Sequence, residues 1–235
     1  MNEIRLGAGV LDPKPTPTAP VLSGAVPLRR RLLAVAAVVS PLALSAQYAL
    51  DPTGMLPRDN PEALLSAIAA EPGQYLASTV VFLLGIITLV AWALTLFAAL
   101  RDRMPKLAAT TATMLTLAAI GGAGFAGLRL AACSFVDDGE VTPGAVEIWE
   151  RLQTGPVFNV LTPLLAMTIL GSLLAGVALI RARSEVTVWA GPLYLVGFVL
   201  GSGEFPVAFS VAGGLLQAVA VLLVARLAVK PSRNR

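Results

Sequence analysis

Six long hydrophobic runs divide this chain, and no other feature limits its possible folds as strongly. The runs cover about residues 31–50, 78–100, 107–132, 157–180, 186–203 and 207–229 of the 235. A helix needs roughly 20 mainly apolar residues to cross the ~30 Å hydrocarbon core of a bilayer. Only 13% of the residues are charged, whereas soluble domains carry about 25%. The sequence therefore predicts an all-α, polytopic membrane bundle of six transmembrane helices, with the lipid bilayer as its surroundings.

We expect one membrane domain, residues 29–230, between two polar ends. Residues 1–28 are rich in proline, which lacks a backbone N–H donor and disfavours helix, so they predict a disordered cytoplasmic tail. Residues 231–235 form a short basic C-terminus. The first run follows three arginines and also resembles a cleavable signal sequence, whose removal would leave five helices. The long leading tail and the lack of a clean small-x-small cleavage site favour retention of this run.

The basic residues divide very unequally between the two sides that six crossings define. One side collects both termini and the segments 101–106 and 181–185, with 14 Lys and Arg residues; the other collects only Arg58 and Arg151, with ten of the 14 acids. Because cytoplasmic segments are enriched in Lys and Arg, we expect cytoplasmic N- and C-termini and an acidic outer face. Arginine outnumbers lysine by 14 to 3, which favours a GC-rich bacterium and its inner membrane. The basic residues lie beside hydrophobic runs, so nucleic acid is not an expected partner.

Two segments on the acidic side predict short amphipathic helices along the outer surface. In the first, Asn60 is the expected N-cap and Pro61 the first helical residue; in the second, Thr142 and Pro143 take these places. Their apolar faces are, in order, Leu64, Leu65 and Ile68, and Ala145, Ile148, Trp149 and Leu152. Such helices either form lids packed on the bundle or present a binding surface to a periplasmic ligand or partner.

An arginine stands near the end of the third run, in the stretch GFAGLRLAAC. Counting ~1.5 Å per residue from Leu107 places Arg129 ~33 Å along the helix, at the outer edge of a ~30 Å core. Several glycines precede it, so another helix can approach this part closely. We expect Arg129 to meet an acid at the outer mouth of the bundle, first Glu204, then Glu147 or Asp137. Either a structural ion pair or an anion-binding or gating site fits a charge at this depth.

The fifth run carries a packing signal and is followed by a lone acid. Gly197 and Gly201 form a Gly-x-x-x-Gly pair, which favours close helix contact. Glu204 lies in the following turn, GSGEFP. Its carboxylate is either solvated, paired with Arg129, or a proton or cation site.

Polar residues inside the runs are sparse. Asn159 and Thr162 stand just before Pro163, whose ring frees a backbone carbonyl one turn back. With Tyr194 and Gln217, they are candidates for the wall of a polar cavity. The alternative is that these side chains, and others such as Gln47, serve helix packing through single hydrogen bonds.

The usual catalytic and metal-binding residues are scarce. The chain has no histidine, the commonest general base and metal ligand, and its single cysteine, Cys133, excludes a zinc or iron–sulfur cluster held by cysteines. No nucleophile stands beside a base, and no carboxylate pair lies within the runs. We therefore expect a non-enzymatic protein with no metal, cofactor or catalytic residue.

The order of these features resembles a bacterial six-helix membrane family of unknown function, the DUF4386 type. The similar stretches are PEALLSAIAAEPGQYLAST, GFAGLRLAAC and YLVGFVLGSGEFP. The family pattern has an acid three residues after the arginine, where this chain has Ala132. The resemblance implies six helices and no established activity.

These observations favour an accessory subunit or a sensor, whose acidic extracytoplasmic face meets a partner or ligand. A second membrane protein or another copy of the chain is the expected kind of partner. The alternative is a small-solute transporter, which requires a polar cavity enclosed by the third to sixth helices and reaching the middle of the membrane.

Overall fold

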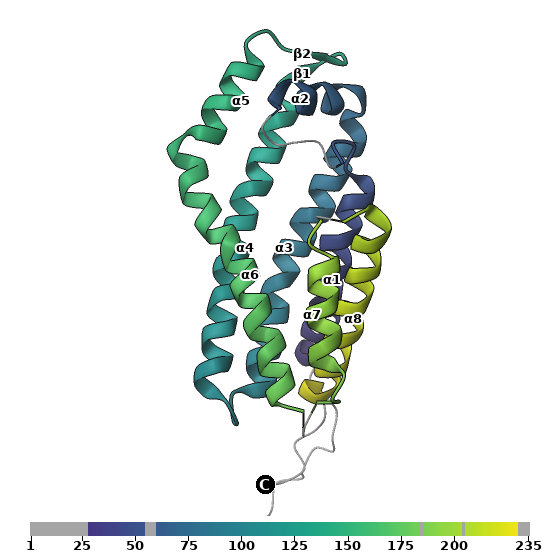
Figure 1. Ribbon diagram of the computed structural model, residues 1–235, viewed down its shortest axis with the longest axis vertical. Coiled ribbons are helices and arrows are strands. Elements are labelled where there is room, and N and C mark those ends of the chain that lie inside the picture. The colour runs from purple at the N-terminus through teal and green to yellow at the C-terminus, as the bar shows by residue number, and fades with distance from the viewer. Residues whose placement is uncertain (1–27, 55–59, 184–185, 204, 230–235) are drawn as a thin grey trace, which may run out of the picture.

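The computed structural model describes residues 28–54, 60–183, 186–203 and 205–229. The structure is helical apart from one short β-hairpin within these ranges (Figure 1). The helices are α1 (Leu28–Leu50), α2 (Pro61–Ala70), α3 (Pro72–Leu100), α4 (Pro105–Cys133), α5 (Ala145–Thr154), α6 (Pro156–Arg181), α7 (Ala190–Leu200) and α8 (Val207–Val229); the strands are β1 (Val136–Asp137) and β2 (Glu140–Val141).

Five of these helices, α1, α3, α4, α6 and α8, are long and apolar enough to cross a membrane. The chain is therefore an all-α, multi-pass membrane bundle, as the composition predicts. The full-length helix expected over residues 186–203 is not found, because α7 has only 11 residues, a length of ~16 Å at ~1.5 Å per residue. Helix α7 ends at Leu200 with Gly201 as its C-cap, and Gly203 has a φ of 82°, a backbone conformation that glycine adopts without strain.

The five long helices and α7 form a ring in which each contacts its neighbours in the order α6, α4, α3, α1, α8, α7 and back to α6. Helix α3 also contacts α8 across the ring. Helix α2, the β-hairpin and α5 cover one end, and we call residues 60–70 and 134–154 the cap. Figure 1 shows α7 confined to the half of the bundle away from the cap.

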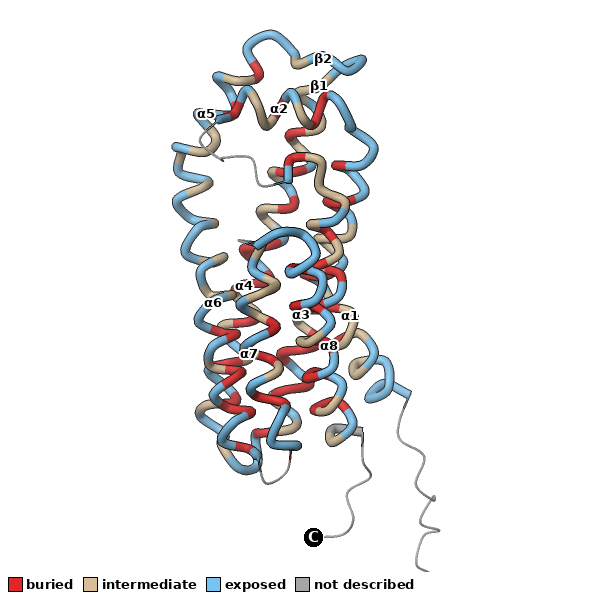
Figure 2. The backbone as a smooth tube through the Cα atoms, turned by 45° about the vertical axis from the view of Figure 1, so that its right-hand side comes forward, coloured by how far each residue is buried: buried red, intermediate tan, exposed pale blue. Residues whose placement is uncertain are grey.

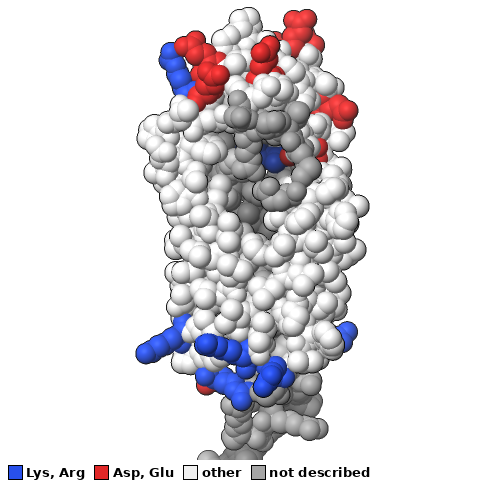
Figure 3. Space-filling model, viewed as in Figure 1, with Lys and Arg blue, Asp and Glu red and all other residues white. Residues whose placement is uncertain are grey.

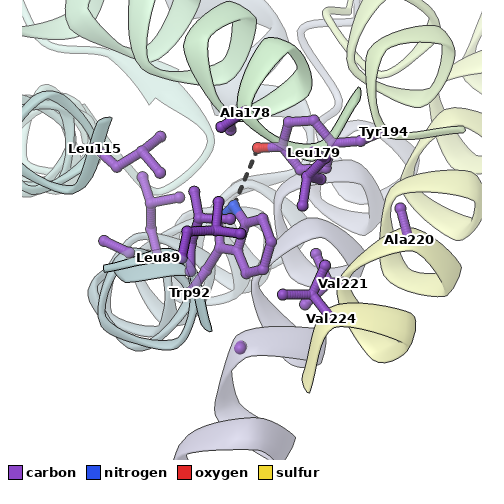
Figure 4. Close-up of a cluster of buried hydrophobic side chains, with 14 of the residues drawn as sticks. Leu89, Trp92, Leu115, Ala178, Leu179, Tyr194, Ala220, Val221 and Val224 are labelled. Atoms are coloured by element: carbon purple, nitrogen blue, oxygen red, sulfur yellow. Dashed lines mark hydrogen bonds between the residues drawn. The ribbon is translucent and has the colours of Figure 1, made fainter. Parts of the chain in front are cut away.

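The half that contains α7, here called the basic half, has a dry hydrophobic core. Its centre is Trp92 of α3, which is 1% exposed. The Trp92 Nε1 donates a hydrogen bond to the Tyr194 Oη of α7 at 3.1 Å (Figure 4). Leu115, Leu179 and Val221 surround the pair from three further helices. Trp92 therefore lies at the point where most of the ring meets.

Small residues let α7, α8 and α1 approach one another at backbone distance. A Cβ atom added at Gly197 would lie 2.6 Å from the carbonyl oxygen of Gly213. On the other side of α8, a Cβ atom at Gly214 would lie 2.9 Å from the carbonyl oxygen of Pro41. The Gly-x-x-x-Gly pair thus packs against α8, in agreement with the sequence signal.

The cap has its own small core. Leu65 and Ile68 of α2 and Trp149 of α5 are buried there against Tyr75 of α3 and Ala132 of α4. The predicted N-cap of α2 is confirmed, since Asn60 Oδ1 accepts a hydrogen bond from the Ala63 N–H at 3.0 Å.

The prediction for α5 is wrong in two respects, the start of the helix and one residue of its apolar face. Its N-cap is Gly144, with a φ of 79°, so Thr142 and Pro143 precede the helix. Ile148 is 49% exposed, because the cap contacts α5 through the side that carries Ala145 and Trp149.

Charge separates the two ends of the molecule (Figure 3). The cap carries seven exposed acids and one exposed basic residue, Arg151, among its described residues and the adjoining Glu71. The other end carries the basic residues of the helix termini and connecting turns: Arg29, Arg30, Arg31, Arg101, Arg103, Lys106, Arg181, Arg183 and Arg226.

Candidate functional site

Arg129 lies one turn before the end of α4 and is only 8% exposed. Its partner is Asp51, which directly follows α1: Arg129 Nη2 lies 2.9 Å from Asp51 Oδ2, and both side chains are about nine-tenths buried. Counted at ~1.5 Å per residue from Arg31, Asp51 is ~30 Å along α1. The acid therefore reaches the same level of the bundle as the arginine, at the cap end.

Three neutral side chains complete the guanidinium's surroundings. Arg129 Nε donates to Thr79 Oγ1 at 3.1 Å, Nη1 to Gln47 Oε1 at 3.2 Å and Nη2 to Ser78 Oγ at 2.9 Å. The Ser78 hydroxyl in turn donates to the Gln47 carbonyl oxygen at 3.0 Å. We call Arg129, Asp51, Gln47, Ser78 and Thr79 the arginine cluster; it joins the outer ends of α1, α3 and α4.

The arginine cluster also fixes the carboxylate. Asp51 Oδ1 accepts from the Thr53 backbone N–H at 3.0 Å and from the Thr53 hydroxyl at 2.6 Å. Oδ2 is left for the arginine. A buried charge is costly unless it is paired and hydrogen-bonded, and both charges here meet that condition.

Two aromatic rings flank the guanidinium. Arg129 Cζ lies 4.8 Å from the ring centre of Tyr75 and 5.8 Å from that of Phe82, within the range of cation–π attraction. Tyr75 is also part of the cap core. The same ring thus contacts the arginine cluster and the cap.

The acids that the sequence favoured as partners have other positions. Glu147 pairs with Arg151 on α5 at 2.6 Å, with both side chains mostly exposed, and Asp137 is an exposed residue of the hairpin. Glu204 lies outside the described residues. Asp51 is not among the partners predicted from the sequence, although an acid that directly follows an apolar run of membrane length is a recognisable signal.

Helix α1 also holds the turn after α7. The Tyr48 hydroxyl donates to the Ser202 carbonyl oxygen at 3.2 Å, and a Cβ atom added at Gly203 would meet the Tyr48 ring. This turn therefore packs beside the outer end of α1, one helical turn from Asp51.

The four residues proposed for a polar cavity fall into two separate places. Tyr194 is 3% exposed in the basic half, and Gln217 packs behind Gly197 on the α7–α8 contact. Asn159 is exposed on the outer half of α6, and Thr162 is exposed there and donates to the Phe158 carbonyl oxygen of its own helix at 2.8 Å.

Distance along the helices separates these two places. Gly176 of α6 packs on Leu195 of α7, so Tyr194 lies near the level of Gly176, and Thr162 is 14 residues or ~21 Å further along α6. The structure places Tyr194 and Gln217 where α7 packs in the bundle, and Asn159 and Thr162 on the exposed cap half of α6, so it does not bring the four together.

Comparisons of the chain with protein-family models, with curated proteins and with solved structures return no match. The resemblance to the DUF4386-type family stays a prediction. A function for this fold has to come from the chemistry of its own sites.

Proposed function

We propose that this protein is a non-enzymatic component of the bacterial inner membrane, an accessory subunit or a sensor, and that the cap is its recognition surface. The observation that carries the proposal is the physical link between the cap and the arginine cluster. Tyr75 contacts the guanidinium on one side and belongs to the cap core on the other. A partner that moves the cap thereby acts on the joined ends of α1, α3 and α4.

The proposed orientation follows from the charges. The basic end faces the cytoplasm, where Lys and Arg are enriched, and the acidic cap faces outward. Both chain ends then lie in the cytoplasm, which requires an even number of crossings, so a sixth crossing has to accompany the five long helices. The sixth crossing consists of α7 and the turn after it. Along α8, Val207 is 19 residues, or ~28 Å, from Arg226 at the basic end. The turn that leads into Val207 therefore reaches the outer boundary of the membrane.

Irregular backbone at such a depth is tolerated where it is buried in protein or lines a cavity. The contact of Tyr48 with Ser202 and Gly203 supplies protein cover on one side of the turn. This contact supports a sixth crossing made of α7 and the turn that follows it.

The partner that the cap fits best is positively charged. Its seven exposed acids are Glu62, Glu71, Asp137, Asp138, Glu140, Glu147 and Glu150. Complementary charge raises the rate at which a partner meets such a surface and suppresses wrong partners. A cationic segment of another membrane protein, or of a periplasmic protein, has the required chemistry.

The transporter alternative has less support from the geometry. Alternating access requires polar groups that converge on a site near the middle of the membrane. Here Tyr194 is paired with Trp92 in the dry core, while Thr162 bonds to its own helix some 20 Å away by residue count.

The orientation is tested by labelling single cysteines in intact cells, in a Cys133→Ser background. We expect an impermeant maleimide to label Asp138→Cys in the cap hairpin and to spare Arg103→Cys at the basic end. Labelling of Arg103→Cys would reverse the orientation.

The recognition role is tested by a photo-activated cross-linking residue at position 140, in the full chain in its own membrane. We expect one discrete adduct, which is lost when Asp137→Asn and Asp138→Asn remove two of the neighbouring charges. The matched control, Arg101→Gln with Arg103→Gln, changes the same number of charges at the opposite end and keeps the adduct. An adduct indifferent to the hairpin acids, or none from position 140, contradicts the proposal.

A further inference from the structure

The cap half of α6 is almost uncovered. None of residues 156–170 is buried, whereas six residues between Gly171 and Leu179 are (Figure 2). The outer part of this helix packs on α4, where Cβ atoms added at Gly121 and Gly124 would meet Leu164 and Leu161. Apart from this contact, a large apolar part of the helix surface remains free in the described structure.

The cause is the early end of α7. Helix α7 packs on α6 at Gly176. Residues seven apart lie on nearly the same face of a helix, so Ile169 and Thr162 continue this face toward the cap. Both are exposed, Ile169 by 55%, because α7 stops before their level. Figure 3 shows a hollow in this half of the uncharged belt.

An aromatic row crosses from α3 to α6 in this half. The ring centres of Phe82 and Phe125 are 6.1 Å apart, and those of Phe125 and Phe158 are 6.4 Å apart. All three side chains are partly exposed. The row begins beside the arginine cluster, since Phe82 lies under the guanidinium of Arg129.

Arg129 retains hydrogen-bonding capacity at this place. A guanidinium has five N–H groups. Three hydrogen bonds and the Asp51 ion pair engage at most four of them among the described residues. Nη1 has one hydrogen bond for its two N–H groups. Counting along α4 places Arg129, one turn before the end of that helix, at this depth.

We propose that the hollow between the outer halves of α6 and α4 and the end of α7 binds one acyl chain of a glycerophospholipid, whose ester or phosphate oxygen accepts a hydrogen bond from Arg129. The hollow lies within the depth of the hydrocarbon core, where lipid chains are the surrounding solvent. The spare donor lies at the boundary, where the oxygen acceptors of a phospholipid begin. The chain packs along Phe125 and Phe158, and this binding is independent of any partner on the cap.

The test uses the full chain in nanodiscs that contain a phospholipid with a diazirine on its acyl chain. We expect light to attach the lipid to the peptides that carry Phe125 and Phe158. Ile169→Trp places an indole in the hollow and abolishes this labelling. Val160→Trp, its matched control, adds the same ring to an exposed position, 63% accessible, on the opposite face of α6, and leaves labelling unchanged.

A second readout is native mass spectrometry of the detergent-purified protein. One retained phospholipid is expected in the parent and in Val160→Trp, and its loss in Ile169→Trp. If Ile169→Trp fails to fold, Thr162→Trp repeats the test, since Thr162 lies two helical turns closer to the cap on the same face of α6. Labelling spread evenly over lipid-facing positions, or equal labelling in all variants, overturns the proposal.

Discussion

The two halves of the bundle are held together in different ways. In the basic half, all six ring helices contribute buried residues to the core that contains Trp92, and this core is almost entirely apolar. In the cap half, α7 is missing, α6 is largely uncovered, and α1, α3 and α4 are joined by the arginine cluster.

This difference explains why the chain keeps a buried charge in the cap half. Apolar packing between helices gains little in lipid, since hydrocarbon tails are as apolar as leucine; close contact and interhelical hydrogen bonds must supply the stability. In the basic half small residues allow close contact, as at Gly197. The cap half has one helix fewer, and there the charge-assisted hydrogen bonds that Arg129 donates supply the stability instead.

Removal of the arginine should have the largest effect. Arg129→Met leaves the Asp51 carboxylate buried without its cation, and breaking a buried pair costs roughly 3–5 kcal/mol. We expect this loss in the free energy of unfolding, measured by denaturant titration of the reconstituted protein. Adding Asp51→Leu should recover most of it, because two apolar side chains replace the pair. If the double variant is no more stable than Arg129→Met, the two charges are not coupled.

Disturbing the close contact in the basic half should come next. Gly197→Leu forces a side chain toward the Gly213 carbonyl oxygen, and overpacking of this kind costs about 1–3 kcal/mol. Gly127→Leu is the matched control, since nothing lies within 4 Å of a Cβ atom added there. We expect the thermal midpoint to fall for the first variant only. Equal losses for both would mean that the Gly-x-x-x-Gly contact is unimportant.

The hydrogen bond at the centre of the basic half should contribute less. Trp92→Phe removes the donor to Tyr194, and Tyr194→Phe removes the acceptor. A double-mutant cycle on unfolding free energies should give a coupling of about 0.6 to 1.7 kcal/mol, the range for hydrogen bonds between membrane helices. Strictly additive losses would place the two side chains out of contact.

The smallest effect is expected on the surface of the cap. Glu147→Gln removes the exposed ion pair with Arg151, and such pairs between residues four apart on a helix contribute about 0.3–0.5 kcal/mol. The thermal midpoint should barely change, and less still at high salt. If Glu147→Gln destabilised the protein as much as Arg129→Met, Glu147 would have to belong to a larger network of charged groups, which its exposed position does not suggest.

Local features of the fold were predictable because they depend on spacing along the chain. The apolar runs predict membrane helices, Asn60 and Pro61 predict the start of α2, and Gly197 and Gly201 predict a close contact. The same reasoning failed over residues 186–203. Hydropathy alone does not distinguish a full helix from a half-helix followed by a glycine-rich turn.

The candidate site was only half predictable. Counting residues along the helix predicted that Arg129 lies at the outer edge of the membrane and that an acidic side chain lies beside it. It did not select Asp51, because several acids satisfy the same count. Ser78 and Thr79 were not singled out either, since a hydroxyl near the start of a helix is usually unremarkable.

By itself, the sequence determined the five long apolar helices, which end of the bundle is basic, and how far along its helix the arginine lies. These follow from composition and from ~1.5 Å of rise per residue. Only the tertiary structure decided that α1 carries the partner acid and that α7 leaves a hollow beside α6. Those outcomes depend on which helix faces which, and side-chain packing between residues far apart in the chain sets that choice.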